Sequence, residues 1–169
     1  MALTGKLQAL IGATLTGSPE LGGASWDIGS DGKITIALAD GSAVNQATKV
    51  FQDHIAAAGG ATTYDLDAGT MVNGLGVAIA AFSRIVALLV IAPAANAAVV
   101  SVGGDFILTK YLVPGGDTLA NVTIPVHPGG FFFWTAPSAT GVAVTASSGD
   151  AIVVTPGAPD TADVIIIGS

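Results

Sequence analysis

Short apolar runs separated by glycine and proline are the feature that most limits what this chain can fold into. Among 169 residues there are 23 glycines and eight prolines, and most of them lie between apolar segments such as 85–91 and 151–155. Short segments rich in β-branched residues and bounded by turn residues are typical of all-β sandwiches and barrels. The pattern predicts a mainly all-β fold, an antiparallel β-sandwich of jelly-roll-like type.

The individual strands can be placed from the same pattern. Alternation of Ile34, Ile36 and Leu38 between two Asp-Gly turns marks one face of a strand over 33–38. Further strands are predicted at 62–66, 77–82, 85–91, 98–102, 106–111, 121–126, 130–134, 142–147, 151–155 and 162–167. The number of strands fits two packed antiparallel sheets.

Residues 42–58 are the best candidate for one short helix in the body of the chain. Ser42 could cap the helix, apolar residues recur near helical spacing, and Gly59-Gly60 would end it. The alternative is an extended segment, because Thr48, Val50 and Ile55 favour strands.

The first 25 residues differ from the rest, so we divide the chain into an N-terminal arm (1–25) and a β-sandwich domain (26–169). Residues 16–25 have loop composition. Leu3, Leu7, Leu10 and Ile11 give the arm apolar side chains that could dock on a neighbouring subunit. The alternative is a frayed terminus.

Charged residues are scarce, which restricts the class of protein. Only 10% of the residues are charged, five Lys or Arg and twelve Asp or Glu, against about 25% in an ordinary chain. The five cations form no basic patch, so nucleic acid is not an expected partner. Arg84 and Pro93 interrupt the longest apolar stretch, so no membrane span is expected, and the first residues do not resemble a signal peptide.

No pattern of catalytic or metal-binding residues stands out. The chain has no cysteine, and neither His54 nor His127 accompanies a nucleophile motif. Asp65 and Asp67 read as turn carboxylates, and residues 27–32 lack the distal glutamate of a calcium loop. The sequence therefore predicts no catalytic residue, no cofactor and no metal.

The aromatic run at 131–134 is the strongest candidate for a binding surface. Neighbouring residues of a strand point to opposite faces, so Phe131 and Phe133 take one side and Phe132 and Trp134 the other. One reading is a central strand covered on both sides by its own chain. The other is a subunit interface that includes Phe131, Phe133 and Trp134, because aromatic residues concentrate binding energy.

The order of several motifs over 40–169 resembles small virion structural proteins encoded among the head and tail genes of tailed bacteriophages. The matching segments include Asn45-Gln46-Ala47, Tyr64-Asp65-Leu66-Asp67-Ala68-Gly69, Phe82-Ser83-Arg84-Ile85, Val100-Ser101-Val102-Gly103-Gly104, Val126-His127-Pro128-Gly129-Gly130-Phe131, Ser148-Gly149-Asp150 and Val164-Ile165-Ile166-Ile167-Gly168. The resemblance implies a virion component with a β-sandwich fold and no catalytic site, foremost a capsid decoration (cement) protein on the outer head surface.

The expected partners follow from this resemblance. They are further copies of the chain, with a trimer favoured over a dimer because shell symmetry offers three-fold sites, and the major capsid protein or another virion protein. Two alternatives stay open: a tail, tail-tip or spike component, and a carbohydrate-binding adhesive sandwich. A sugar site would use Trp26, Trp134, Tyr64 or Tyr111.

Overall fold

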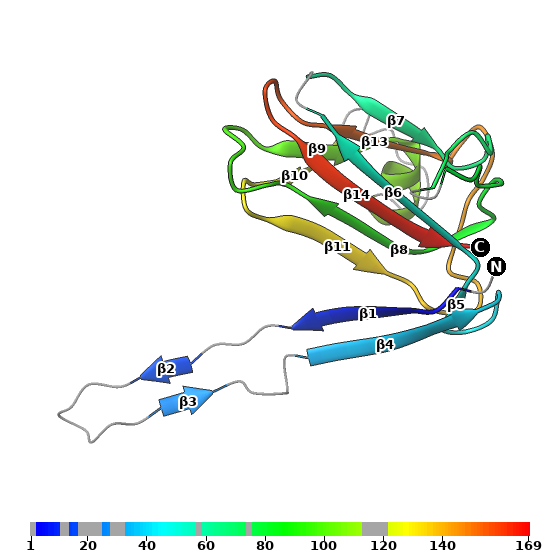
Figure 1. The fold of residues 1–169 in the computed structure, drawn as a ribbon, viewed down its shortest axis with the longest axis horizontal. Coiled ribbons are helices and arrows are strands. Elements are labelled where there is room, and N and C mark those ends of the chain that lie inside the picture. Colours follow the sequence, from blue (N-terminus) through cyan, green and yellow to red (C-terminus); the bar gives the residue numbers. More distant parts are fainter. Residues whose placement is uncertain are drawn as a thin grey trace.

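The computed structural model describes residues 3–10, 14–16, 25–27, 33–56, 59–73, 76–112 and 122–169. Strands dominate this part of the chain (Figure 1), which confirms the all-β, sandwich-like prediction. The strands are β1 (Gly5–Leu10), β2 (Thr14–Thr16), β3 (Ser25–Asp27), β4 (Lys33–Asp40), β5 (Gln46–Ala47), β6 (Lys49–Ile55), β7 (Thr62–Asp65), β8 (Arg84–Ile91), β9 (Val100–Gly103), β10 (Ile124–Val126), β11 (Phe131–Thr135), β12 (Val142–Ala143), β13 (Ala151–Thr155) and β14 (Ala162–Gly168).

Two sheets form the body of the molecule. The larger sheet has the order β11-β8-β14-β6, with β12 also paired to β8, and the smaller one has the order β10-β9-β13-β7. All pairings in both sheets are antiparallel. We call the face of the larger sheet that packs on the smaller sheet its inner face, and the opposite face its outer face.

The core lies between the two sheets. Along β14 burial alternates, with Val164 and Ile166 fully buried and the residues between them partly exposed. These side chains pack with Leu88 and Val90 of β8 and with Ile152, Val154, Val100 and Val102 of the smaller sheet. Period-two burial is what the inner face of a sheet requires.

The helix expected at 42–58 is wrong. This segment forms β5 and β6, and β6 pairs with β14 along its whole length. Phe51 and Ile55 turn inward while Gln52 and His54 point outward, which is a strand pattern. Tertiary pairing with the apolar β14 outweighs the weak helical spacing.

Two strand predictions are also wrong. Residues 106–111 form the short helix α1 (Asp105–Ile107) and the π-helical turn η3 (Leu108–Leu112), with Phe106 and Ile107 in the core. Gly104 precedes them with φ of 95°, and a side chain there would collide with the Ala151 carbonyl, so the strand ends at this glycine. Residues 77–82 carry one isolated bridge, between Val72 and Ala78, and no strand.

A β-hairpin of β1 and β4 projects away from the sandwich (Figure 1). Gly5–Leu10 pairs antiparallel with residues 33–38 of β4, and the shorter pair β2–β3 lies farther out along the same arm. The first strand of the proposed arm is thus paired with β4, and β5 joins β4 in parallel to lead the chain into β6.

Arg84 ties the base of this hairpin to the sandwich. Its side chain is 5% exposed, and its guanidinium donates to the carbonyl oxygens of Ser138 (2.6 Å) and Gln46 (2.9 Å) and to the Ser169 hydroxyl (2.8 Å). Gln46 belongs to β5, so one buried cation connects β8, the hairpin base and the loop after β11. Five donors in a fixed plane make arginine suited to such a junction.

The acidic side chains of the core also have structural partners. Asp53 of β6 accepts the Tyr64 hydroxyl of β7 at 2.8 Å, joining the two sheets, and burial followed by this hydrogen bond raises the pKa of Tyr64 well above its usual range. Asp160 accepts the backbone N–H groups of Ala97 and Ala98. Among the described residues no buried side-chain nitrogen or oxygen lacks a hydrogen-bond partner.

Replacing Arg84 tests the junction. In Arg84→Met the carbonyl oxygens of Ser138 and Gln46 lose their donors, so we expect the free energy of unfolding to fall by about 2–4 kcal/mol in urea titration. Lys110→Met is the control, because the hydrogen bond from Lys110 to Thr145 is solvent-exposed, and it should cost less than about 0.5 kcal/mol. Equal losses in the two variants would contradict this role for Arg84.

Candidate functional site: an apolar groove beside the hairpin

The outer face of the larger sheet is apolar, although only part of it is covered. The strand register places Phe133, Leu89 and Ile165 side by side across β11, β8 and β14, with Phe131, Ile91 and, at the start of β14, Asp163 in the next row. Leu89, Ile91 and Ile165 are partly buried, and Phe131 is 68% exposed. Apolar residues on both faces of a sheet require a cover on both sides.

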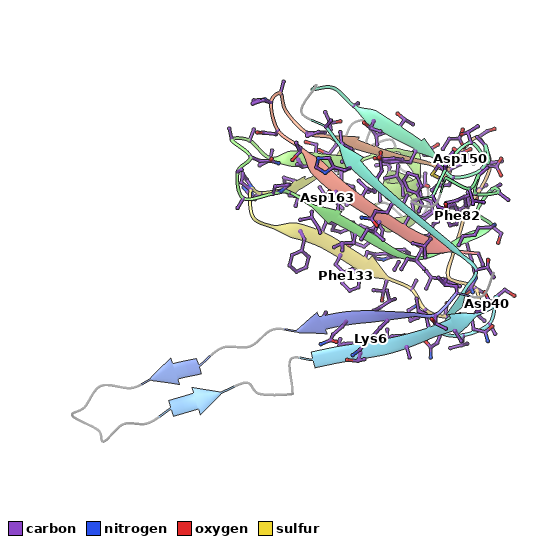
Figure 2. All side chains as sticks on the ribbon, in the orientation of Figure 1. Lys6, Asp40, Phe82, Phe133, Asp150 and Asp163 are labelled. Carbon is purple, nitrogen blue, oxygen red and sulfur yellow. The ribbon has the colours of Figure 1, made fainter. Side chains whose placement is uncertain are left out.

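The hairpin supplies the cover at one end of this face. Leu7 of β1 and Leu38 of β4 are 6% and 4% exposed, and they form a second core cluster with Ala47, Val86 and Ala87. Leu3, Ile36, Phe133 and Ile167 pack around this cluster. Figure 2 shows Phe133 on the side of β11 that faces the hairpin.

An open groove continues from this cluster between β1 and the sheet. Its volume is about 790 Å³. It is lined by residues 6–9 of β1, by the turn and strand at 129–133, and by Ala87, Leu89, Ile91, Tyr111, Ile165 and Ile167. Lys6 is the one charged residue of this lining, so the groove has apolar walls and no carboxylate.

A second, smaller groove of about 210 Å³ lies next to it, between Ile34 and Ile36 of β4 and Phe133 and Thr135 of β11. Ile34 is 65% exposed. The two most exposed large apolar side chains of the described chain, Phe131 and Ile34, therefore border neighbouring hollows, one on the sheet and one on the hairpin. Contiguous exposed apolar surface of this kind marks interaction sites.

Polar groups lie at the margins of the outer face. At the start of β14, Asp163 Oδ1 lies 2.7 Å from His54 Nδ1 of β6, and both side chains are solvent-accessible. On the opposite, inner side of the sheet, Lys49 at the start of β6 donates to the Ala81 carbonyl at 2.5 Å and lies over the Phe82 ring, and burial lowers the pKa of Lys49. These groups hold strands and loops together and leave the groove itself apolar.

The residues that the sequence marked for an interface are distributed unequally. Leu3 and Leu7 pack on the chain's own sheet, and Phe131 and Phe133 lie on the outer face as the alternation indicated. Trp134 points to the inner side and packs against the main core. The Leu10 side chain and Ile11 lie outside the described part of the chain.

Trp134 belongs to an aromatic cluster with Phe132 and Tyr111. The Tyr111 ring meets the other two edge-on, at interplanar angles of 78° to Phe132 and 86° to Trp134. Rings that stand edge to face bury part of one another's surfaces, although Tyr111 remains 44% exposed. The cluster closes the sandwich at η3. The Trp26 side chain lies outside the described part of the chain.

The residues considered above for catalysis, such as His127 and Asp65, take part in hydrogen bonds that hold turns. His127 is exposed in a turn where its carbonyl accepts the Gly130 N–H, and Asp65 accepts the N–H groups of Asp67 and Ala68. Over the described ranges, no three His, Asp or Glu side chains gather as a metal site would need. Most of the calcium-like segment at 27–32 lies outside those ranges.

No helix in the described part of the chain is both long enough and apolar enough to span a bilayer. Comparison with protein-family models, with curated proteins and with solved structures gave no match.

Sequence reasoning missed the hairpin wall of the groove. Ile34, Ile36 and Leu38 were assigned to a strand of the sandwich, whereas they form the apolar face of a projecting hairpin. The signal available was the apolar alternation on both sides of residues 11–32, since Leu7 and Ile36 are directly opposite in the register. Two alternating segments around a polar stretch are what a long hairpin requires.

A matched pair of substitutions tests the packing of the outer face. Phe133→Ala should lower the free energy of unfolding by about 1–2 kcal/mol, because it removes a ring packed on the hairpin cluster. Phe131→Ala, two residues away on the same face, should change it by less than about 0.5 kcal/mol. Urea titration in dilute solution measures both, and similar losses would show that Phe133 does not support the hairpin.

Proposed function

We propose that this chain is a non-enzymatic structural subunit of a tailed-phage particle, a capsid decoration protein that attaches to the outer shell. The observation that carries the proposal is the sandwich with an arm that extends beyond its core (Figure 1). An arm of paired strands reaches a neighbouring protein while the sandwich stays folded. The motif order over 40–169, which resembles phage structural proteins, supports the same assignment.

The composition supports a role in a permanent assembly. The chain is 51% apolar and only 10% charged, and its mean hydropathy is +0.71. Interfaces of permanent complexes bury about 2,000–5,000 Å² and are more apolar than ordinary surface. A net charge of −7 suits a position outside the shell, away from packaged nucleic acid.

The buried and half-buried charged groups support a non-enzymatic role. Arg84, Asp53, Asp105 and Asp160 each hold backbone or side-chain groups of their own chain together. A catalytic group needs a free donor or acceptor within reach of a substrate. In the described part of the chain these side chains are engaged in maintaining the fold.

The base and the distal part of the arm have different roles in this proposal. The base, β1 and β4, packs on the chain's own sheet, whereas β2 and β3 lie farther out. We assign shell attachment to the part of the arm beyond Leu10 and Lys33. The partners in this proposal are the major capsid protein and further copies of the chain, arranged as the symmetry of the shell dictates.

Trimming the arm tests the assignment. Leu10 and Lys33 are directly opposite in the β1–β4 register, so residues 11–32 can be replaced by Asn-Gly, which closes a two-residue hairpin. The trimmed chain should keep its unfolding midpoint, because Leu7 and Leu38 are retained, and should lose attachment to undecorated shells at least about tenfold in a sedimentation assay.

The control is the full-length chain with Thr35→Ser, a mild change on the exposed side of β4. Attachment that is unchanged after trimming would refute the role of the distal arm. The copy number in dissociated particles separates head from tail: a number comparable with that of the shell protein supports decoration, and a few copies per particle place the chain in the tail.

A further inference from the structure

We propose that two copies of this chain associate through the groove, with the hairpin of each copy lying against the exposed part of the other's outer face. The occupant of the groove is thus a second copy of the chain. This inference concerns the purified protein alone and holds whether or not the chain attaches to a phage shell.

The apolar face of the hairpin continues beyond the part that already packs on its own sheet. The β1–β4 register places Leu7 opposite Ile36 and Ala9 opposite Ile34 on one face of the hairpin. This apolar stripe is buried at its base, where Leu7 meets the sheet, and reaches solvent at Ile34. A second copy presents the same stripe, which already fits this sheet surface.

The outer face of the sheet likewise continues beyond the part that its own hairpin covers. Phe133 is packed against the chain's own hairpin, whereas Phe131, two residues along the same face, is 68% exposed. Both residues line the larger groove. Beyond the side chains that its own hairpin covers, the sheet therefore offers the apolar pair Phe131 and Ile91, with Asp163 as the third member of their row.

The distribution of charge also favours association at the groove. Two copies of a chain with a net charge of −7 repel one another over most of their surfaces. The groove lining contains no carboxylate and carries the cation Lys6. Close approach of two acidic chains costs least at this surface.

Open strand edges beside the groove also favour association with a second copy. Among the strands that the structure describes, β1 pairs only with β4, and β11 pairs only with β8. Both strands border the groove, so their remaining backbone groups are at hand for a strand or hairpin from another molecule. A reciprocal arrangement about a two-fold axis uses the surface of each copy once and closes the assembly.

Light scattering during size-exclusion chromatography tests the association. The wild-type chain should have about twice the single-chain mass of 16.5 kDa. Ile34→Glu and Phe131→Glu each place a carboxylate on an exposed apolar residue of the interface, so each should shift the mass to that of one chain. At concentrations low enough to dissociate the wild-type dimer, the variants and the wild type should have the same unfolding midpoint. Val72→Glu, on a residue that is 50% exposed and outside the groove lining, should leave the dimer intact.

Cysteine pairing identifies the contact itself. The chain has no cysteine, so Ile34→Cys and Phe131→Cys can be made as separate single variants and mixed. Under mild oxidation the mixture should form a disulfide-linked pair of two different chains, and a mixture of Val72→Cys with Phe131→Cys should form at least about tenfold less.

A single-chain mass for the wild type at every concentration tested would overturn the inference. So would a dimer that survives both glutamate variants. If such a single chain still attaches to shells, the proposed function stands without the inference. If a dimer that depends on Ile34 binds no shell, the inference stands and the proposed function falls.

Discussion

The pairing of β8 with β14 is the constraint on which the rest of the structure depends. Every side chain from Arg84 to Leu88 is buried, and Val164 and Ile166 of β14 are fully buried as well. Two central strands with apolar residues on both faces cannot be stable with one layer of cover. The smaller sheet covers the inner face, and the β1–β4 hairpin covers one end of the outer face. The groove is the part of the outer face that remains.

The polar contacts of the fold depend on the same arrangement. Arg84 lies on a central strand, and it is buried because the hairpin base and the loop after β11 both close over it. A cation in this position needs several oxygen acceptors, and backbone carbonyls from distant segments provide them. Asp105 works in a similar way at the other side of the sandwich, where it accepts the N–H groups of Asp150 and Ala151. Several of the few charged side chains therefore join segments that are distant in the sequence.

The scarcity of charged side chains also explains the surface. Since charged side chains are few and several of these are engaged internally, the exterior contains apolar residues such as Phe131 and Ile34 that an isolated chain would leave in water. Protein neighbours are the simplest cover for such residues. The proposed particle subunit and the proposed pairing of copies are separate consequences of this one property, and the first uses the distal arm while the second uses the groove at its base.

The sequence by itself determined the strand content, because period-two alternation and glycine turns are local signals, and it determined that Phe131 and Phe133 share a face. It did not determine which segments pair. The 42–58 segment contains a strand because it pairs with β14. Residues 106–111 form helical turns after Gly104, whose backbone lies too close to the Ala151 carbonyl for a side chain. Ile34 belongs to the hairpin because its strand pairs with β1. Pairing joins residues far apart in the chain, and only the tertiary structure decides which apolar face finds a cover within the molecule and which is left for another.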